Sequence, residues 1–297
     1  MITRPLGPGA PAVSAIGFGG MPLSIAGRPS EDQAIRAVHA ALDAGITLID
    51  TADVYCLDDN DIGHNERLIA RALKQWPGKK DRLVLATKGG LTRPGGGWER
   101  VRDPAHLRQA CDRSLKALGV DRIDLYQLHA PMPGTSIAQS AEVLAELKRA
   151  GKVRWVGLSN VSVSEIEQAR GIVDVVTVQN RLNPFFRESL EPGFLREPSV
   201  VEYCGTKGIG FLAYSPVGGG RLNLKLPTLP ILATIAQKHS ATPHAVVLAW
   251  VLAQGPTIIP IPGGRTVEHV KDAASAADLK LTLPELDEIT KTQFSKA

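Results

Sequence analysis

The stretch Ile46-Thr-Leu-Ile-Asp50 is a short apolar run that ends on a carboxylate. Two later runs have the same form: Leu83-Val-Leu-Ala-Thr-Lys88 ends on an ammonium group, and Ile123-Asp-Leu-Tyr-Gln-Leu-His129 ends on an imidazole. Short apolar runs of this kind are typical of strands that are buried on both faces of a parallel sheet. Tyr55 lies in the loop after the first run. Polar residues at the carboxyl ends of such strands converge on one site, so we expect Asp50, Tyr55, Lys88 and His129 to lie together.

Strand and helix patterns alternate from these three runs towards both ends of the chain. The predicted strands cover residues 13–18, 48–50, 83–87, 123–128, 153–158, 173–178, 209–213 and 257–261. The predicted helices cover residues 30–44, 66–73, 103–118, 137–150, 163–170, 200–207, 242–253 and 266–276. Such alternation predicts a parallel sheet. Eight units within 297 residues favour a closed α/β structure, a (β/α)8 TIM barrel, over a doubly wound open sheet.

Both ends of the chain carry segments outside this alternation. The segment before Val13 contains Gly7-Pro-Gly-Ala-Pro11 and predicts an N-terminal β-hairpin that closes the bottom of the barrel. Near the other end, Thr282 and Glu285 have the spacing of a capping box and predict an extra C-terminal helix over residues 284–291. No linker or low-complexity segment interrupts the chain, so we interpret residues 1–297 as a single domain.

Composition and charge argue against several classes of protein. The net charge of +4 comes from Lys and Arg residues that are spread along the chain, which argues against nucleic-acid binding. The three cysteines have no metal-type spacing and do not suggest a disulfide framework, so we expect a reducing, cytoplasmic environment. No apolar run has the length of a signal peptide or of a membrane span, so no membrane association is predicted. The sequence does not indicate an oligomeric state.

Further motifs follow the later predicted strands. They are Gly157-Leu-Ser-Asn160, Gln179-Asn180, Tyr214-Ser-Pro216 and Ile261-Pro-Gly-Gly-Arg265. Together with residues 45–52, Tyr55 and the run that ends at His129, they resemble the aldo-keto reductase family over about residues 13–277. The resemblance implies an NADP(H)-dependent oxidoreductase that reduces an aldehyde or ketone to an alcohol. It implies that the catalytic residues are Asp50, Tyr55, Lys88 and His129.

The same four residues can be interpreted from their chemistry alone. Reduction of a carbonyl needs a hydride on the carbon and a proton on the oxygen, and Tyr55 is the candidate proton donor. A free phenol has a pKa of about 10, and a neighbouring Lys88 ammonium is expected to lower the pKa of Tyr55. Asp50 would hold Lys88 in place, and His129 would orient and polarise the substrate oxygen. None of these groups delivers hydride, so a nicotinamide cofactor is required.

The resemblance also implies how NADPH or NADP⁺ is bound. Tyr214 is expected to stack on the nicotinamide ring, whose carboxamide and surroundings would be contacted by Gly20, Met21, Asp50, Ser159, Asn160 and Gln179. No Gly-x-Gly-x-x-Gly motif opens the first helix, so the phosphates must bind elsewhere.

Barrels often bind phosphate at the loops after strands seven and eight, and both loops are rich in glycine here. The predicted residues are Ser215, Pro216, Val217, Gly218, Gly220 and Arg221, then Pro262, Gly263, Gly264 and Arg265, with His269 and Asp272 on the following helix. The second loop opens a helix whose N-terminus favours anions, and Arg265 is expected to bind the 2′-phosphate. The alternative is that these glycines only turn the chain.

Three other segments bear on the substrate. Trp98 belongs to the loop of residues 89–102, which is expected to overhang the pocket and to contact the substrate. The acidic stretch of residues 56–62 lacks the ligand alternation of a calcium loop, and we interpret it as a solvated loop rather than a substrate contact. The tail of residues 294–297 is short, which predicts an open pocket for a small-molecule carbonyl substrate.

Two other functions stay open at the level of sequence. An NADP-binding barrel that reports redox state to a partner protein would have the same residues, with only incidental turnover. A metal-dependent hydrolase would need histidines paired at a strand end. The candidates are dispersed, so we predict no metal at His64, His129, His239, His244 or His269.

Overall fold

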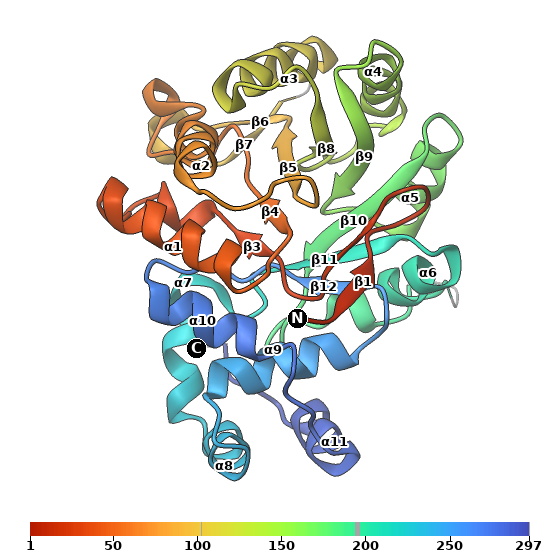
Figure 1. Ribbon diagram of the computed structural model, residues 1–297. Coiled ribbons are helices and arrows are strands. Elements are labelled where there is room, and N and C mark those ends of the chain that lie inside the picture. The colour runs from red at the N-terminus through yellow and green to blue at the C-terminus, as the bar shows by residue number, and fades with distance from the viewer. Residues whose placement is uncertain (102, 194–196, 297) are drawn as a thin grey trace.

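Eight parallel strands form one curled sheet at the centre of the molecule (Figure 1). The computed structural model describes residues 1–101, 103–193 and 197–296. Along the sheet the strands follow the order β12-β11-β10-β9-β8-β5-β4-β3. Their bounds, in chain order, are β3 Phe18–Gly19, β4 Leu48–Asp50, β5 Val84–Gly89, β8 Ile123–Leu128, β9 Val153–Ser159, β10 Val175–Arg181, β11 Gly210–Tyr214 and β12 Ile258–Pro260.

Backbone hydrogen bonds join the first strand of this sheet to the last. The amide of Gly17 donates to the carbonyl of Pro260, and the amide of Gly19 to the carbonyl of Pro262, each at 2.9 Å. A Cβ atom at Gly19 would lie 2.7 Å from the carbonyl oxygen of Ile261, so this close approach requires glycine. These bonds close the sheet into a barrel and confirm the predicted (β/α)8 fold.

Helices cover the outside of the barrel (Figure 1). Side chains of Ser30, Asp103 and Thr242 cap three of them, as their sequence signals predict. The helices are α1 Glu31–Asp43, α2 His64–Gln75, α3 Pro104–Leu118, α4 Ala138–Arg149, α5 Val163–Arg170, α6 Val200–Lys207, α8 Pro230–Lys238, α9 Pro243–Ala253 and α10 Val267–Ser275, with α11 Leu283–Lys291 as the predicted C-terminal addition. Sequence analysis missed α8, which has proline at its start but no side chain that caps its N-terminus.

The apolar core has two layers, which explains why the strands are apolar on both faces. Inside the barrel lie Leu48, Val84, Leu125, Leu212 and Ile259, one from each of five strands. Outside it, larger clusters pack the opposite strand faces against the helices. Strands enclosed in this way read as continuous apolar runs, without the polar alternation of a half-exposed sheet.

The N-terminal hairpin is present, but the predicted first barrel strand over residues 13–18 is wrong. β1 Thr3–Pro5 pairs antiparallel with β2 Ala12–Ser14, and only Phe18–Gly19 joins the barrel as β3. The break comes at Ser14, whose backbone amide donates to the hydroxyl of Thr47 at 2.8 Å. Residues 13–18 are all buried, so the apolar pattern continues across the break between hairpin and barrel.

The hairpin closes one end of the barrel. Its Leu6 is fully buried among the side chains of the barrel interior. At Gly210, at the start of β11, a Cβ would lie 2.0 Å from the carbonyl oxygen of Leu6. The opposite end is the one at which the parallel strands terminate, and the candidate site lies there.

Among the residues that the structure describes, no helix has both the length and the apolar character needed to cross a bilayer. The same residues contain no cluster of three or more His, Cys, Asp or Glu side chains arranged to hold a metal ion.

Candidate active site

Four side chains meet at the carboxyl ends of the strands, as their positions in the sequence predict. Asp50 ends β4, Lys88 lies in β5, His129 follows β8, and Tyr55 lies in the loop after β4. The Lys88 ammonium donates to Asp50 Oδ2 at 2.5 Å, to the carbonyl of Thr51 at 2.9 Å and to Tyr55 Oη at 3.0 Å. All three of its protons therefore have acceptors, and one points at the phenol.

Lys88 and Asp50 form a buried ion pair. Their side chains are 0% and 2% exposed. Burial is the largest influence on the Lys88 pKa and acts to lower it, but the charge of Asp50 and hydrogen bonds to Asp50 and Tyr55 together raise the pKa above its ordinary value. The ammonium is therefore charged at neutral pH. Removing either partner would leave the other charge buried and uncompensated.

Two glutamines hold the second oxygen of the Asp50 carboxylate. Gln179 Nε2 donates to Asp50 Oδ1 at 2.8 Å, and Gln127 Nε2 donates to the same atom at 3.1 Å. Gln179 was predicted to contact the nicotinamide carboxamide, and Gln127 was not predicted to belong to the site. The available signal was a polar residue inside an apolar strand, two positions before His129. These bonds orient the carboxylate that orients Lys88.

The expected lowering of the Tyr55 pKa is wrong as a net effect. Burial of the phenol raises its pKa, and the opposing influence of the Lys88 charge does not overcome it. Tyr55 is therefore protonated across the physiological range, as a proton donor must be. The Lys88 charge acts to lower the Tyr55 pKa, which is the direction that favours a tyrosinate.

His129 is a neutral imidazole beside the phenol. Burial lowers the pKa of His129 well below its ordinary value, and the charge of Lys88 adds to the effect. The ring lies edge-on to Tyr55, with 5.7 Å between the ring centroids. Its Nδ1 atom is buried and has no hydrogen-bond partner in the described structure. Such an orphaned ring nitrogen fits a site that binds a polar ligand atom.

Trp98 lies above these two rings. It precedes β7 Glu99–Arg100, which pairs antiparallel with β6 Leu91–Thr92. Its indole meets Tyr55 and His129 edge-on, at centroid distances of 6.2 and 6.3 Å, and remains 47% exposed. The structure thus places the predicted substrate-contact residue against both the candidate proton donor and the imidazole.

Residues predicted to surround the nicotinamide lie next to the same site. Asn160 Nδ2 donates to the carbonyl of His129 at 2.9 Å, and Tyr214 Oη donates to Asn160 Oδ1 at 2.8 Å. Ser159 is buried beside them, and Gly20 donates its amide to the carbonyl of Asp50 at 2.8 Å.

Two residues in this region have an unusual backbone conformation. Asn160, after β9, has φ of 59°, and Ser215, after β11, has φ of 47°. Non-glycine residues with positive φ are uncommon and cluster at functional sites. Both lie where sequence analysis placed cofactor contacts.

The two glycine-rich loops follow β11 and β12 as predicted. In the first loop, Gly218 and Gly219 have φ of 91° and 72°, which requires glycine, whereas a Cβ at Gly220 would meet nothing within 4 Å. In the second loop, Gly263 and Gly264 have a packing role, because Cβ atoms there would lie 2.4 Å from Pro22 and 2.8 Å from Val270.

Arg265 anchors a neighbouring loop through its guanidinium. Its Nε donates to the carbonyl of Pro22, and one terminal nitrogen to the carbonyl of Ala26, both at 3.1 Å. Both acceptors are neutral, so these bonds do not neutralise the positive charge. Farther along, the carboxylate of Asp272 accepts from the hydroxyl of Thr242 at 2.8 Å, and His269 is exposed on α10.

The sequence matches a known protein family over most of its length. The model of the aldo/keto reductase family matches residues 15–293. The chain belongs to this family. It is 34% identical to the aldo-keto reductase str7 of Strobilurus tenacellus over 95% of this chain and 90% of that protein. The family assignment suggested by the sequence motifs is confirmed.

Solved structures of other aldo-keto reductases share its fold. A glycerol dehydrogenase from Gluconobacter oxydans is 30% identical, with a TM-score of 0.80 over 97% of this chain and 94% of that one. An aldo-keto reductase from Klebsiella pneumoniae in complex with NADPH is 25% identical, with a TM-score of 0.78 over 99% of this chain and 98% of that one. The protein is therefore an oxidoreductase of the aldo-keto reductase family, built on the (β/α)8 barrel.

The acidic stretch is exposed or half-buried over residues 57–62, as expected of a solvated loop, and two of its carboxylates also contact neighbouring segments. Asp59 Oδ1 accepts from the backbone amide of Arg93 at 2.9 Å, and Asp61 pairs with Arg28 at 2.5 Å. Cys56 is buried, and burial raises the pKa of its thiol to about 11, which makes it an unreactive packing residue.

The C-terminal tail lies against the first glycine-rich loop. Arg221 donates to the carbonyl of Lys296 at 2.6 Å, and Phe294 packs edge-on against Phe185 at a centroid distance of 5.5 Å. Arg221, predicted to contact the cofactor, is thus engaged by the tail. Ala297, and Arg102 of the predicted pocket loop, lie outside the described residues.

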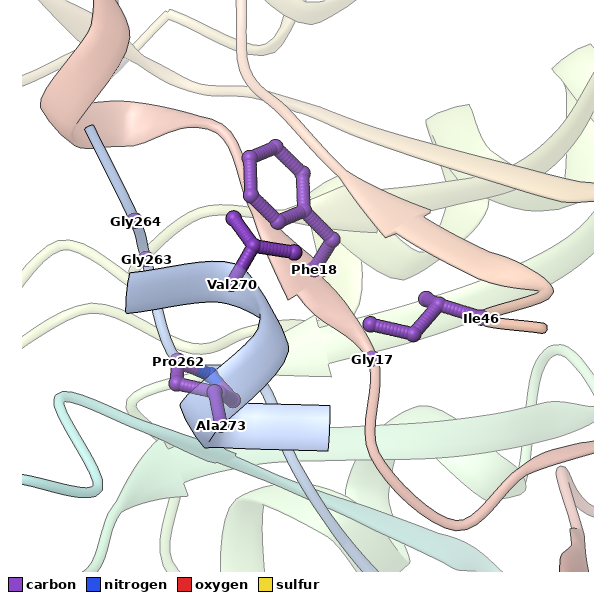
Figure 2. Close-up of a pocket in the computed structure, with 8 residues that line it drawn as sticks. All are labelled: Gly17, Phe18, Ile46, Pro262, Gly263, Gly264, Val270 and Ala273. Carbon is purple, nitrogen blue, oxygen red and sulfur yellow. The ribbon is translucent and has the colours of Figure 1, made fainter. Parts of the chain in front are cut away.

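A narrow crevice lies between α10 and the start of the sheet (Figure 2), and none of the four candidate catalytic residues lines it. It is too narrow to hold a water molecule. It is lined by Gly17, Phe18, Ile46, Pro262, Gly263, Gly264, Val270 and Ala273. The second glycine-rich loop forms part of the lining, so the crevice is a gap in the packing between this loop, the sheet and α10.

Proposed function

We propose that this aldo-keto reductase uses NADPH to reduce an aldehyde or ketone to an alcohol, with Tyr55 as the proton donor. The observation that carries the proposal is the hydrogen bond of Lys88 to Tyr55 Oη at 3.0 Å, made by an ammonium that is fully buried against Asp50. A buried cation aimed at a phenol favours loss of the phenolic proton.

The residues around the site fit a dinucleotide. Next to the catalytic side chains lie polar groups that would hold a carboxamide, namely Ser159, Asn160 and Gln179. Farther out, the open position at Gly220 gives a ligand access to the backbone. Arg265 supplies a positive charge that is bonded to no carboxylate within the described part of the chain. When bound, the nicotinamide would supply the hydride.

The protein's own contribution is to position the carbonyl and to deliver the proton. The substrate oxygen would lie between Tyr55 Oη and the imidazole of His129, which would polarise it as negative charge develops. Tyr55 would then transfer its proton to that oxygen, and Lys88 would stabilise the tyrosinate. A positioned acid of this kind contributes on the order of 10²–10⁴ to the rate.

The test is a panel of aldehydes and ketones followed by the absorbance of NADPH. Steady oxidation of NADPH that depends on the carbonyl, with the matching alcohol as product, supports the proposal. Tight NADPH binding without turnover of any panel member would instead favour the redox-sensing alternative.

Trp98→Ala should change the preference between substrates. The indole borders Tyr55 and His129, whereas both phosphate loops follow other strands, so its loss should affect substrate more than cofactor. We expect kcat/KM to fall more for aromatic than for aliphatic aldehydes, with little change in NADPH affinity. An unchanged ranking would place Trp98 outside the substrate pocket.

Arg265→Ala should reduce discrimination between NADPH and NADH. A charge-assisted contact to the 2′-phosphate is typically worth roughly 1.5–3 kcal/mol, about a tenfold to hundredfold loss of NADPH affinity. NADH affinity should hardly change, and the loss should shrink at high salt. Because Arg265 also anchors Pro22 and Ala26, equal weakening of both cofactors would show that it only supports that loop.

A further inference from the structure

Arg93, directly after β6, is buried, and no carboxylate among the described residues pairs with its guanidinium. The residue is 5% exposed, and its side chain donates to the backbone carbonyls of Cys56 at 3.1 Å, Leu57 at 3.4 Å and Gly97 at 3.3 Å. Its Nε atom is buried without a partner in the described structure. Burying a cation among neutral acceptors costs free energy of folding. We therefore expect this arginine to serve the function of the protein.

The guanidinium lies over the face of Trp98, 3.9 Å from the ring centroid. Tryptophan is the side chain whose face best attracts a cation. One face of the indole is covered by Arg93, and the ring also makes T-shaped contacts with Tyr55 and His129, so contacts from three side chains restrict its orientation.

The chain next to Trp98 would not hold the indole by itself. Residues 95–97 are three consecutive glycines, and Gly95 and Gly96 have φ of 54° and 84°. Glycine populates many backbone conformations, so such a turn is intrinsically loose. The contacts of Arg93 compensate for that freedom.

Arg93 also ties this turn to the loop that carries the proton donor. The carbonyls of Cys56 and Leu57 directly follow Tyr55 in the chain, and Asp59 of the acidic stretch accepts from the Arg93 backbone amide at 2.9 Å. One side chain therefore fixes the distance between the Tyr55 loop and the Trp98 turn, which form two sides of the substrate site.

We propose that Arg93, supported by Asp59, is a positioning residue that holds Trp98 as a rigid wall of the site and thereby favours substrates whose carbonyl is attached to a flat ring. The proposal rests on the proposed carbonyl reduction. A fixed indole offers a large apolar surface to an aromatic aldehyde, whereas a short aliphatic aldehyde gains little from it.

The experiment compares benzaldehyde with propanal in the full-length enzyme. Arg93→Met should lower kcat/KM for benzaldehyde about tenfold, mainly through KM, and that for propanal by about twofold or less. Arg93→Lys retains the charge but loses the planar group, so it should not restore the benzaldehyde activity. As a matched control, Arg108→Met removes an exposed ion pair with Glu146 on the outer helices and should leave both substrates unchanged.

A second measurement reports on the orientation of Trp98 without using enzyme activity. Labelling with 5-fluorotryptophan gives signals for the four tryptophans, and Trp98→Phe assigns that of Trp98. Arg93→Met should shift and broaden this signal alone, whereas general destabilisation would affect all four. If Arg93→Met does not fold, Asp59→Ala, at an exposed position, should produce the same changes to a smaller degree.

The outcomes separate the two proposals. A wild-type enzyme that reduces neither aldehyde with NADPH counts against the proposed function, while the fluorine signal still reports on Trp98. An active wild type whose benzaldehyde-to-propanal ratio is unchanged in Arg93→Met, or in Asp59→Ala if that is the variant that folds, would overturn the role of Arg93. An unchanged Trp98 signal in the folded variant would overturn it as well.

Discussion

Tyr55→Phe should remove most carbonyl reduction, lowering kcat on the order of 10²–10⁴-fold. The substitution deletes only the phenolic oxygen, which is the atom that would supply the proton. The neighbouring groups are poor substitutes: the pKa of Lys88 is raised by Asp50 and Tyr55 against the effect of burial, so it is a weak acid, and burial lowers the pKa of His129, so its imidazole is already neutral.

NADPH binding and folding serve as controls for this variant. Fluorescence titration should show nearly wild-type NADPH affinity, because the aromatic ring stays in place. The lost hydrogen bond to Lys88 should reduce the free energy of unfolding by about 1 kcal/mol. Turnover close to the wild-type rate would mean that Tyr55 is not the acid.

Lys88→Met should abolish activity to a similar extent and also destabilise the fold. Without the ammonium, nothing stabilises the tyrosinate, so kcat should again fall on the order of 10²–10⁴-fold. The carboxylate of Asp50 would remain buried without its counter-charge. Breaking such a pair typically costs about 3–5 kcal/mol of unfolding free energy, measured here by denaturant titration.

A second substitution separates the two effects of Lys88. Asp50→Asn added to Lys88→Met removes the unpaired charge, while its amide oxygen can still accept from Gln127 and Gln179. We expect the double variant to regain most of the lost stability but none of the activity. Recovery of activity would show that the ion pair serves folding only.

Much of the fold was predictable because each element carries its own local signal. The helices α5 and α6 have the predicted bounds, and the capping boxes at Ser162 and Thr282 mark helix starts through hydrogen bonds within four residues of sequence. The prediction of one strand over residues 13–18 was wrong because no local signal marks where the hairpin ends and the barrel begins. Hairpin and barrel both bury this segment, and hydrophobicity alone does not distinguish two buried environments.

Some residues of the candidate site were predictable from local sequence, and others were not. Strand order and the right-handed crossover place the ends of β4, β5 and β8 at one edge, so Asp50, Lys88 and His129 converge wherever their strands form. Their partners were not predictable. Gln127 and Gln179 reach Asp50 across 77 and 129 residues of sequence, a contact that only the closed barrel creates.

The sequence by itself determined the barrel, the family and the chemical groups at the strand ends, because residue type and spacing depend on local rules. Tertiary structure decided how those groups behave. Burial is a property of the whole packed molecule, and it raises the pKa of Tyr55. Considering only the charge of the neighbouring Lys88 had predicted a lower pKa. Packing likewise brought Arg93 onto the face of Trp98 and joined Asp59 of the acidic stretch to the backbone of Arg93, since these contacts depend on how separate loops meet in space.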